Sequence, residues 1–343
     1  MWSRAWYGGA RWLYLLWPLS LLFRLLGTLR AAYLRSRAVP APLPTIVVGN
    51  ISLGGTGKTP MVIALVEALR ARGYRPAVVS RGYGASLPAR PWRVTEGQSA
   101  AQTGDEALLI HERAGCPVVL DPDRPRAVAA LADSGECDVI ISDDGLQHYA
   151  MARQVEIVLV DAIRGFGNGL CLPAGPLREA PSRVARADHV VINGQSGFRL
   201  PVRPRDTVTH MRLLPTAWVN LYSGEERTPE TLFANTPPHK MPALAGIGNP
   251  DRFFDLLTSL GYEVERHVFD DHHPYGREEV EAISKRASGP VVMTEKDAVK
   301  CKQYADERFW YLRVDAILDE VLVDTIDRSL QALSSVGQQD QRH

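Results

Sequence analysis

Cysteine is scarce in this sequence, and acidic residues are missing from its first 66 positions. The four cysteines are far apart and none forms a C-x-x-C pair; they are Cys116, Cys137, Cys171 and Cys301. Their spacing predicts neither a structural zinc site nor a disulfide framework, and it favours a reducing, cytosolic environment. The 45% hydrophobic and 23% charged residues exclude a disordered tail, a collagen-like repeat and a coiled coil. What remains is a globular composition, and 343 residues predict about two domains.

The missing acid makes the charge uneven along the chain, although 39 basic residues balance 39 acidic ones overall. Up to Val66 there are six Arg and one Lys, so the first 66 residues carry +7 and the remainder carries −7. Within this basic stretch residues 12–23 are uncharged, and four of the seven Trp lie in them or ahead of them. Twelve residues are too few to span a bilayer as a helix, which takes about 20.

Three interpretations of this apolar segment stay open. Its Arg flanks, short apolar core and the pair Ala31-Ala32 fit a cleaved or spanning segment, but a nucleotide-type loop follows, and nucleotides are cytosolic. A buried helix with no membrane role is the second interpretation. We favour the third, an amphipathic anchor over residues 1–40 that lies in the membrane interface, with Trp and Leu at the headgroup boundary. Six basic residues would then meet anionic lipid: Arg4, Arg11, Arg24, Arg30, Arg35 and Arg37.

Short β-branched runs alternate with helical stretches in the rest of the chain. Pro40, Pro42 and Pro44 end the basic segment, because proline removes a backbone donor and restrains the residue before it. From Thr45 onward the alternation predicts an α/β fold with a parallel sheet covered on both faces. We expect a larger α/β domain over residues 41–210, a connecting segment over 211–240 that could include a hairpin, and a smaller α/β domain over 241–335.

A glycine-rich loop follows the strand TIVVG and precedes a helix opened by proline. It contains Gly54, Gly55, Thr56, Gly57, Lys58, Thr59 and Pro60. In a P-loop the backbone N–H groups converge on phosphate, Lys58 would reach the β- and γ-phosphates, and Thr59 could hold Mg²⁺. Ser52 stands where the strict pattern has glycine, so a glycine-rich turn with an incidental GKT is the alternative. The order of strand, loop and helix favours the P-loop.

Two adjacent acids end another apolar run, DVIISDDG. Asp143 and Asp144 would lie at the carboxyl edge of the sheet, where a nucleotide-bound metal is expected. The alternative is a helix N-cap followed by a surface acid.

Other polar residues could act on an acceptor of phosphate. Asp105 and Glu106 open a helix, either as capping acids or as a proton acceptor and a metal ligand. The cluster DDHH at residues 270–273 offers a histidine beside a carboxylate, whereas a two-His zinc site lacks the i,i+4 spacing and a third ligand. Arg178 could clamp phosphate, although an isolated Arg is more often a surface charge.

In combination these motifs resemble a known family. They occur in this order: GNISLGGTGKTP (49–60), SRGYG (80–84), GDE (104–106), DPDR (121–124), SDDGLQH (142–148), GFGNG with LPAGPLRE (165–179), and FDDHHPY (269–275). Each motif is weak alone, but the ordered set is similar to the tetraacyldisaccharide 4'-kinases, the lipid A 4'-kinases of Gram-negative bacteria. Within that family Ser52 is no departure. The resemblance implies a P-loop NTPase-like three-layer α/β/α kinase domain over 41–210, a second, smaller α/β/α domain, and catalysis in the cleft between them.

The resemblance also implies a reaction and roles for residues. The γ-phosphoryl group of Mg·ATP would pass to the 4'-hydroxyl of tetraacyldisaccharide 1-phosphate, at the cytoplasmic face of the inner membrane, where the enzyme would be peripheral or monotopic. Lys58 would bind the transferring phosphate. The metal would be held by Thr59, Glu106, Asp143 and Asp144. Asp105 would accept the sugar proton and His272 would tune it, while Arg178 and Arg124 would position phosphate. His272 is preferred to His273 because it directly follows Asp271.

The main alternative function is a membrane-associated P-loop NTPase switch. Its variant loop usually reads KGGxGKT, but Leu53 stands here where that lysine belongs. A GTPase would need an N-K-x-D motif, and Thr294-Glu295-Lys296-Asp297 does not fit it. The net acidic remainder argues against nucleic acid as a partner, and no obligate protein partner is predicted.

Overall fold

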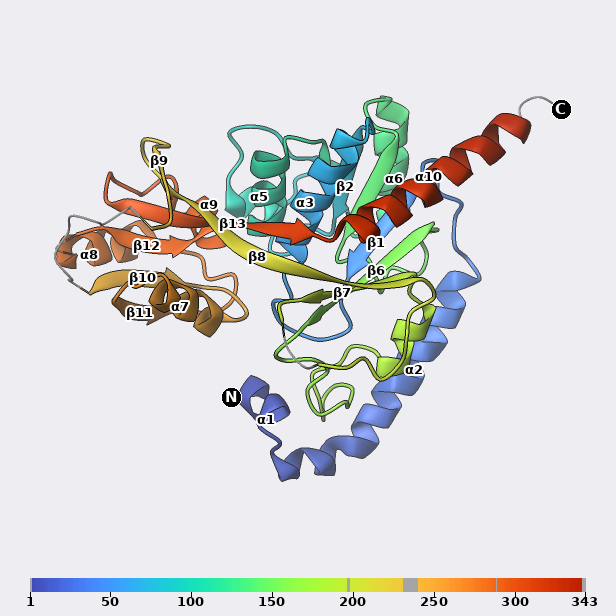
Figure 1. Cartoon of the computed structure of the whole chain (residues 1–343), viewed down its shortest axis with the longest axis horizontal. Helices are drawn as coiled ribbons and strands as arrows, with labels where there is room; N and C mark the ends of the chain where they lie inside the picture. Colours follow the sequence, from blue (N-terminus) through green and yellow to red (C-terminus); the bar gives the residue numbers. More distant parts are fainter. Residues whose placement is uncertain (1, 196–197, 231–239, 288, 341–343) are drawn as a thin grey trace.

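The computed structural model describes residues 2–195, 198–230, 240–287 and 289–340, which form two lobes joined by long strands (Figure 1). Within these residues one continuous sheet runs in the order β11-β10-β12-β13-β8-β7-β6-β1-β5-β2-β4-β3, with β9 paired to β8. The strands are β1 (Thr45–Gly49), β2 (Pro76–Ser80), β3 (Trp92–Arg93), β4 (Val118–Leu120), β5 (Val139–Asp143), β6 (Val155–Asp161), β7 (His189–Asn193), β8 (Thr207–Asn220), β9 (Glu226–Arg227), β10 (Met241–Ala245), β11 (Val264–Val268), β12 (Val291–Thr294) and β13 (Phe309–Leu318). Most neighbouring strands are parallel, which confirms the expected α/β fold.

Helices cover both faces of the sheet in the larger lobe, which contains β1 to β7. The helices of the chain are α1 (Trp2–Tyr7), α2 (Trp17–Arg35), α3 (Lys58–Ala71), α4 (Ala100–Thr103), α5 (Asp105–Ala114), α6 (Arg124–Ser134), α7 (Pro250–Ser259), α8 (Arg277–Arg286), α9 (Glu295–Cys301) and α10 (Glu320–Asp340), with 3₁₀ helices η1 (Arg11–Leu16) and η2 (Pro181–Arg186). Successive side chains of a strand point to opposite faces. Accordingly Ile46 and Val48 of β1 pack with α3 and α5, whereas Val47 packs with α6.

The smaller lobe repeats this arrangement around β10. Ala243 and Ala245 pack against α7 on one face, and Leu244 packs against α8 and α9 on the other. The sheet edge at the carboxyl ends of β10 and β12 faces the larger lobe, and the loop after β10 and the helix α9 after β12 carry residues into the site described below.

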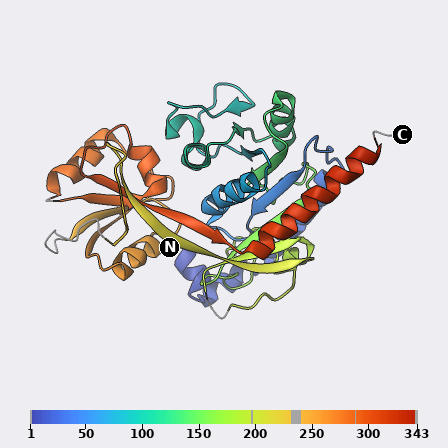
Figure 2. The same ribbon diagram turned by 45° about the horizontal axis from the view of Figure 1, so that its top comes forward.

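The long strands β8 and β13 join the lobes and lie side by side in both views (Figures 1 and 2). The connecting segment expected from residue 211 therefore begins inside a strand: 211–220 are the last ten of the 14 residues of β8, and β9 makes a short hairpin with it. Residues 231–239 of that segment lie outside the described residues. Pro215 of β8 pairs with Val314, directly beside a register shift in β13. A proline cannot donate to a strand ladder, so it is tolerated in a sheet interior at such an irregularity.

The C-terminal helix returns to the larger lobe. Leu322, Ile326 and Leu330 of α10 are buried in the same core cluster as α3, and Arg72 at the end of α3 pairs with Asp324 and two further acids of α10. Residues 320–330, which we expected in the smaller domain over 241–335, thus pack against α3 of the larger lobe.

One helical segment of the described residues, Arg11–Arg35, is long and apolar enough to cross a membrane by length and composition. It joins η1 to α2 and confirms the expected N-terminal apolar helix. The helix continues through Arg24 and Arg30, so it is longer than the 12 uncharged residues that appeared too short to span. Most of it is exposed, which disfavours a buried core helix as its explanation.

Candidate active site

The phosphate loop lies between β1 and α3, as expected, although α3 begins at Lys58 rather than after Pro60. Gly57 has φ +92°, and a Cβ there would lie 2.6 Å from Nδ2 of Asn193, so the position requires glycine. The same Asn193 amide donates to the carbonyl of Thr56 at 2.9 Å. Lys58 Nζ donates to Oδ1 of Asn50 at 3.3 Å and lies 3.6 Å from Oδ1 of Asp144. The ammonium is thereby aimed at the carboxyl end of β5.

Asp143 and Asp144 follow one another at that end but have different surroundings. Asp143 is buried, and Ser80 Oγ donates to its Oδ2 at 3.2 Å, while its Oδ1 has no partner within the described part of the chain. Burial, together with the charges of Glu106 and Asp144, raises the pKa of Asp143. Asp144 has φ +46°, and its Oδ2 accepts a hydrogen bond from Nη1 of Arg178 at 3.0 Å. The charges of Lys58 and Arg178 outweigh burial and lower the pKa of Asp144.

These carboxylates do not form a ready metal cluster. In the ranges that the structure describes, no three or more His, Cys, Asp or Glu side chains are grouped to hold a metal ion. Glu106 is paired with Lys296, and Asp144 with Arg178 and Lys58. The unpartnered carboxylate oxygen of Asp143 is nevertheless the kind of oxygen donor that Mg²⁺ prefers, and Thr59 lines the same cleft. Asp143 is therefore the member of the expected set that fits a Mg²⁺ ion.

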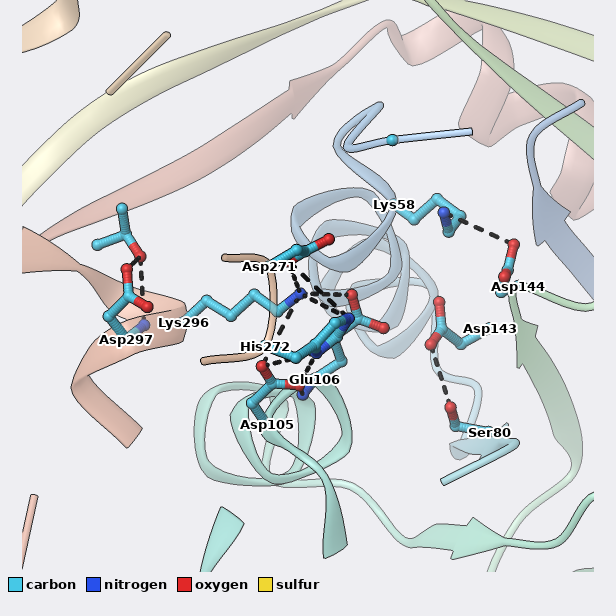
Figure 3. Close-up of polar contacts among 12 residues, drawn as sticks. Lys58, Ser80, Asp105, Glu106, Asp143, Asp144, Asp271, His272, Lys296 and Asp297 are labelled. Carbon is cyan, nitrogen blue, oxygen red and sulfur yellow. Dashed lines mark hydrogen bonds and ion pairs between the residues drawn. The ribbon is translucent and has the colours of Figure 1, made fainter. Parts of the chain in front are cut away.

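Asp105 and His272 meet across the two lobes. His272 Nδ1 lies 3.0 Å from both carboxylate oxygens of Asp105, which is buried at the start of α5 (Figure 3). Burial alone would raise the pKa of Asp105, but the hydrogen bond with His272 and the charge of Lys296 lower it. The hydrogen bond with Asp105 in turn raises the pKa of His272. The structure thus brings together two residues that are 167 positions apart in the sequence.

His273 points elsewhere. Its Nε2 lies 2.9 Å from Oε2 of Glu279, and its ring stacks on Phe269. The preference for His272 as the neighbour of Asp105 agrees with this geometry, and the two histidines do not converge on one point as zinc ligands would.

Arg178 and Arg124 differ in their contacts. The backbone N–H of Arg178 donates to the carbonyl of Ile51 at 2.7 Å, and its guanidinium faces Asp144 and Gln147 in the cleft. Arg124 is 1% exposed and donates to the main-chain carbonyls of Asp121 and Asp143, each at 2.9 Å. The resemblance implies that Arg124 positions phosphate, whereas these hydrogen bonds tie together the ends of β4 and β5.

We expect Arg124→Met to lower the free energy of unfolding by about 2–4 kcal/mol, because two buried carbonyls lose their donors. Chemical denaturation in detergent micelles, followed by Trp fluorescence, measures the change. Arg186→Met is the matched control, since Arg186 is exposed at the end of η2. Equal stability of the two variants would contradict this role for Arg124.

A loop between β6 and η2 links the N-terminal helices to the phosphate loop. On one side Trp6 Nε1 donates to the carbonyl of Pro173 at 3.1 Å, and Ser20 Oγ donates to that of Cys171 at 2.5 Å. On the other side the N–H of Leu53 donates to the carbonyl of Pro176 at 2.8 Å. The loop is therefore held between α1–α2 and residues 51–53.

One cleft of about 1840 Å³ brings together the phosphate loop and charged residues from both lobes. Lys58, Asp143 and His272 line it at the lobe interface, and Phe23 and Leu26 of α2 line it on the N-terminal side. A polar reaction site and an apolar helix thus share a single cavity.

Sequence reasoning missed several residues of this site. Lys296 contacts Glu106 at 3.1 Å and Asp271 at 3.2 Å, and Ser80, Asn50 and Asn193 hold the groups described above. Ser80 belongs to SRGYG, one of the motifs that carry the family resemblance, so the sequence pointed to this loop. Lys296 belongs to the string TEKD, which we compared only with the guanine-binding motif N-K-x-D.

A phosphate loop on a mostly parallel sheet, facing a buried carboxylate, defines a P-loop nucleotide-binding protein of the α/β class. The family model described as tetraacyldisaccharide-1-P 4'-kinase, LpxK, matches residues 12–331. The chain therefore belongs to the tetraacyldisaccharide 4'-kinase family.

Individual relatives agree with this assignment. The chain is 49% identical over 332 residues to the tetraacyldisaccharide 4'-kinase of Pseudomonas entomophila, covering 96% of this chain and 95% of that protein. It is 48% identical over 332 residues to the protein of that name from Pseudomonas aeruginosa, covering 96% of each. Among solved structures, LpxK from Aquifex aeolicus in complex with ATP has a TM-score of 0.76 and 26% identity, covering 93% of this chain and 99% of that one.

Proposed function

We propose that this chain is an ATP-dependent lipid kinase that transfers the γ-phosphoryl group of ATP to the 4'-hydroxyl of tetraacyldisaccharide 1-phosphate in lipid A biosynthesis. The observation that carries the proposal is the shared cleft, which is lined by the phosphate loop, by His272, the partner of Asp105, and by residues of the apolar helix α2. A lipid acceptor needs such a combination, because its hydroxyl must reach the nucleotide while its acyl chains stay in an apolar environment. Family membership supports the same reaction.

The roles of the polar residues follow from phosphoryl-transfer chemistry. Lys58 and the loop N–H groups would bind the β- and γ-phosphates, and Arg178 would approach them from the other side of Asp144. Thr59 and Asp143, with Glu106 and Asp144 nearby, would hold Mg²⁺, whose charge neutralises phosphate oxygens during transfer.

Asp105 is proposed as the proton acceptor. Its lowered pKa keeps the carboxylate ionised, so it can accept the hydroxyl proton as the sugar oxygen attacks the γ-phosphorus and ADP leaves. His272 would orient that carboxylate from the second lobe. We propose accordingly that the lobes are two three-layer α/β/α domains that close on each other about β8 and β13.

We propose that α2 attaches the enzyme peripherally to an anionic membrane, at the cytoplasmic face of the inner membrane. The helix has two faces. Phe23, Leu26 and Ala31 line the cleft, whereas Leu22, Leu25 and Leu29 are exposed and are not among its lining residues. Exposed arginines on η1 and α2 would meet lipid phosphates, although the side chain of Arg4 lies outside the described residues.

We expect Leu22→Gln/Leu25→Gln/Leu29→Gln to reduce binding to vesicles containing phosphatidylglycerol by about tenfold or more, because three leucines lose their apolar contact. Co-sedimentation with these vesicles measures the fraction of protein bound. Val268→Ser is the control, since Val268 is equally exposed on β11 of the smaller lobe. Unchanged sedimentation of the triple variant would contradict an interfacial anchor through this face.

Phosphoryl transfer from γ-labelled ATP tests the function. Purified protein is incubated with Mg²⁺ in mixed micelles, with and without tetraacyldisaccharide 1-phosphate, beside Lys58→Ala. Label in the lipid product, lost in the variant, supports the kinase. Lys58-dependent release of free phosphate with no labelled lipid would instead favour a membrane-associated NTPase switch.

A further inference from the structure

Lys296 projects from the smaller lobe into the center of the candidate active site (Figure 3). Its Nζ lies 3.1 Å from Oε1 of Glu106, 3.2 Å from Oδ1 of Asp271 and 3.9 Å from Oδ2 of Asp105. The side chain is only 16% exposed. One ammonium therefore lies among three carboxylates, and one of them is the proposed proton acceptor.

The charges around Lys296 show what the ammonium does between the lobes. Without Lys296, the carboxylates of Asp105 and Glu106 on α5 would face Asp271 from the other lobe with no cation between them. Like charges repel, and the repulsion is screened least at Asp105, whose side chain is only 5% exposed. Lys58 does not fill this role, because it is aimed at Asn50 and Asp144.

Lys296 also meets the ring of His272. Its Nζ lies 3.5 Å from Nε2, while Nδ1 of the same ring faces Asp105 at 3.0 Å. An ammonium group can only donate, so the nitrogen that faces it is the accepting one. The proton of the neutral ring then sits on Nδ1 and points at Asp105. The two neighbours together select one tautomer and one orientation of His272.

The residues on each side of Lys296 fix the place of its helix. Glu295 pairs with Arg113 of α5, in the larger lobe. Asp297 is fully buried, and its Oδ2 accepts from the N–H of Gly246 at 3.0 Å and from Thr294 Oγ1 at 2.6 Å. Three consecutive residues thus contact the larger lobe, the reaction site and the loop after β10. Lys296 is held rigidly between two anchored neighbours.

We propose that Lys296 is a positioning residue that holds the two lobes together at the reaction site and orients His272 against Asp105. The inference rests on the proposed kinase function, since it assigns Lys296 a part in that same site. Asp271 supports the ammonium from the smaller lobe.

The test compares two lysines of the same region. Lys302 directly follows α9 and pairs with Glu112 of α5 at 3.0 Å, but this contact is exposed and lies away from the site. We expect Lys296→Met to lower kcat at saturating ATP and lipid by about tenfold or more, with KM for ATP changed less than about threefold. Lys302→Met should stay within about twofold of the unaltered enzyme. Lys296→Arg should recover part of the loss, because it keeps the charge.

A double-variant cycle separates positioning from a merely structural role. If Lys296 acts through His272, Lys296→Met adds less than about threefold to the loss in His272→Ala. Multiplicative losses, or a kcat for Lys296→Met equal to that of Lys302→Met, would overturn the proposal. Should Lys296→Met fail to fold, Lys296→Gln carries the same comparison.

The ring ¹⁵N shifts of His272 give a readout that does not depend on turnover. We expect them to change in Lys296→Met and to stay unchanged in Lys302→Met, because only Lys296 faces Nε2. Shifts that change with no labelled lipid formed by the unaltered enzyme would reject the kinase but retain the positioning contact. Unchanged shifts would reject the contact itself, whatever the activity.

Discussion

Asp105→Asn is expected to lower kcat by about 10²- to 10⁴-fold, the range that a positioned general base contributes. The amide keeps the shape of the side chain but cannot accept the hydroxyl proton, and it no longer attracts Lys296 or His272 as an anion. Phosphoryl transfer at saturating ATP and lipid measures the loss. Glu112→Gln, a change of the same kind on the same helix but at its exposed pair with Lys302, should leave kcat unaltered.

The same variant reports on the contact between the lobes. Because the hydrogen bond with Asp105 raises the pKa of His272, Asp105→Asn should lower that pKa toward the ordinary value for histidine. NMR titration of the ring nitrogens of His272 measures this pKa in the variant and in the unaltered enzyme. A low kcat with an unmoved pKa would mean that Asp105 and His272 do not meet in solution, and an unmoved kcat would remove Asp105 as the base.

Lys58→Ala is expected to lower kcat by about 10²- to 10³-fold, the cost of removing one preorganised electrostatic donor to a transition state. Its ammonium lies beside Asp144 and Asn50, at the point where the loop N–H groups and the end of β5 converge. Initial rates with γ-labelled ATP measure the loss. Lys302→Ala serves as the matched lysine control, and Lys58→Arg should restore little, because the longer planar guanidinium does not fit a site built for a point charge.

A wild-type rate in Lys58→Ala would contradict the assignment of residues 54–60 as a phosphate-binding loop. That outcome is hard to reconcile with Gly57, where neighbouring Asn193 leaves no room for a side chain.

The phosphate loop was predictable because its parts are consecutive in sequence. A β-branched run, a glycine-rich loop and the first turn of a helix each carry a local signal, and together they place Lys58 correctly beside the end of β5. The position of Asp143 at the carboxyl end of a strand followed from the apolar run before it.

Contacts between distant residues left no such signal. The pairing of Asp105 with His272 could be expected only from family resemblance, and Lys296 was missed because its partners lie 25 and 190 positions away. The main-chain contacts of Arg124 were not predictable for a related reason. Nothing in the string DPDR shows that the guanidinium is buried against main-chain carbonyls.

The strand β8 was not predicted, because its composition is unfavourable for a strand. Pro215 and two arginines in or near the strand disfavour it in a sequence reading, yet the register shift in β13 lets proline lie opposite Val314 in the middle of the sheet. The join between the lobes depends on this irregular pairing, which only the partner strand reveals.

The loop that carries Arg178 has a consequence for any attempt to make this enzyme water-soluble. A variant that lacks residues 1–39 would lose the apolar helix α2. It would also lose Trp6 and Ser20, which donate hydrogen bonds to that loop. Across the loop lie the backbone of Leu53 and Ile51, at the entrance to the nucleotide site. The helix α2 therefore supports the loop that carries Arg178, and this loop is in turn hydrogen-bonded to Leu53 at the start of the phosphate loop.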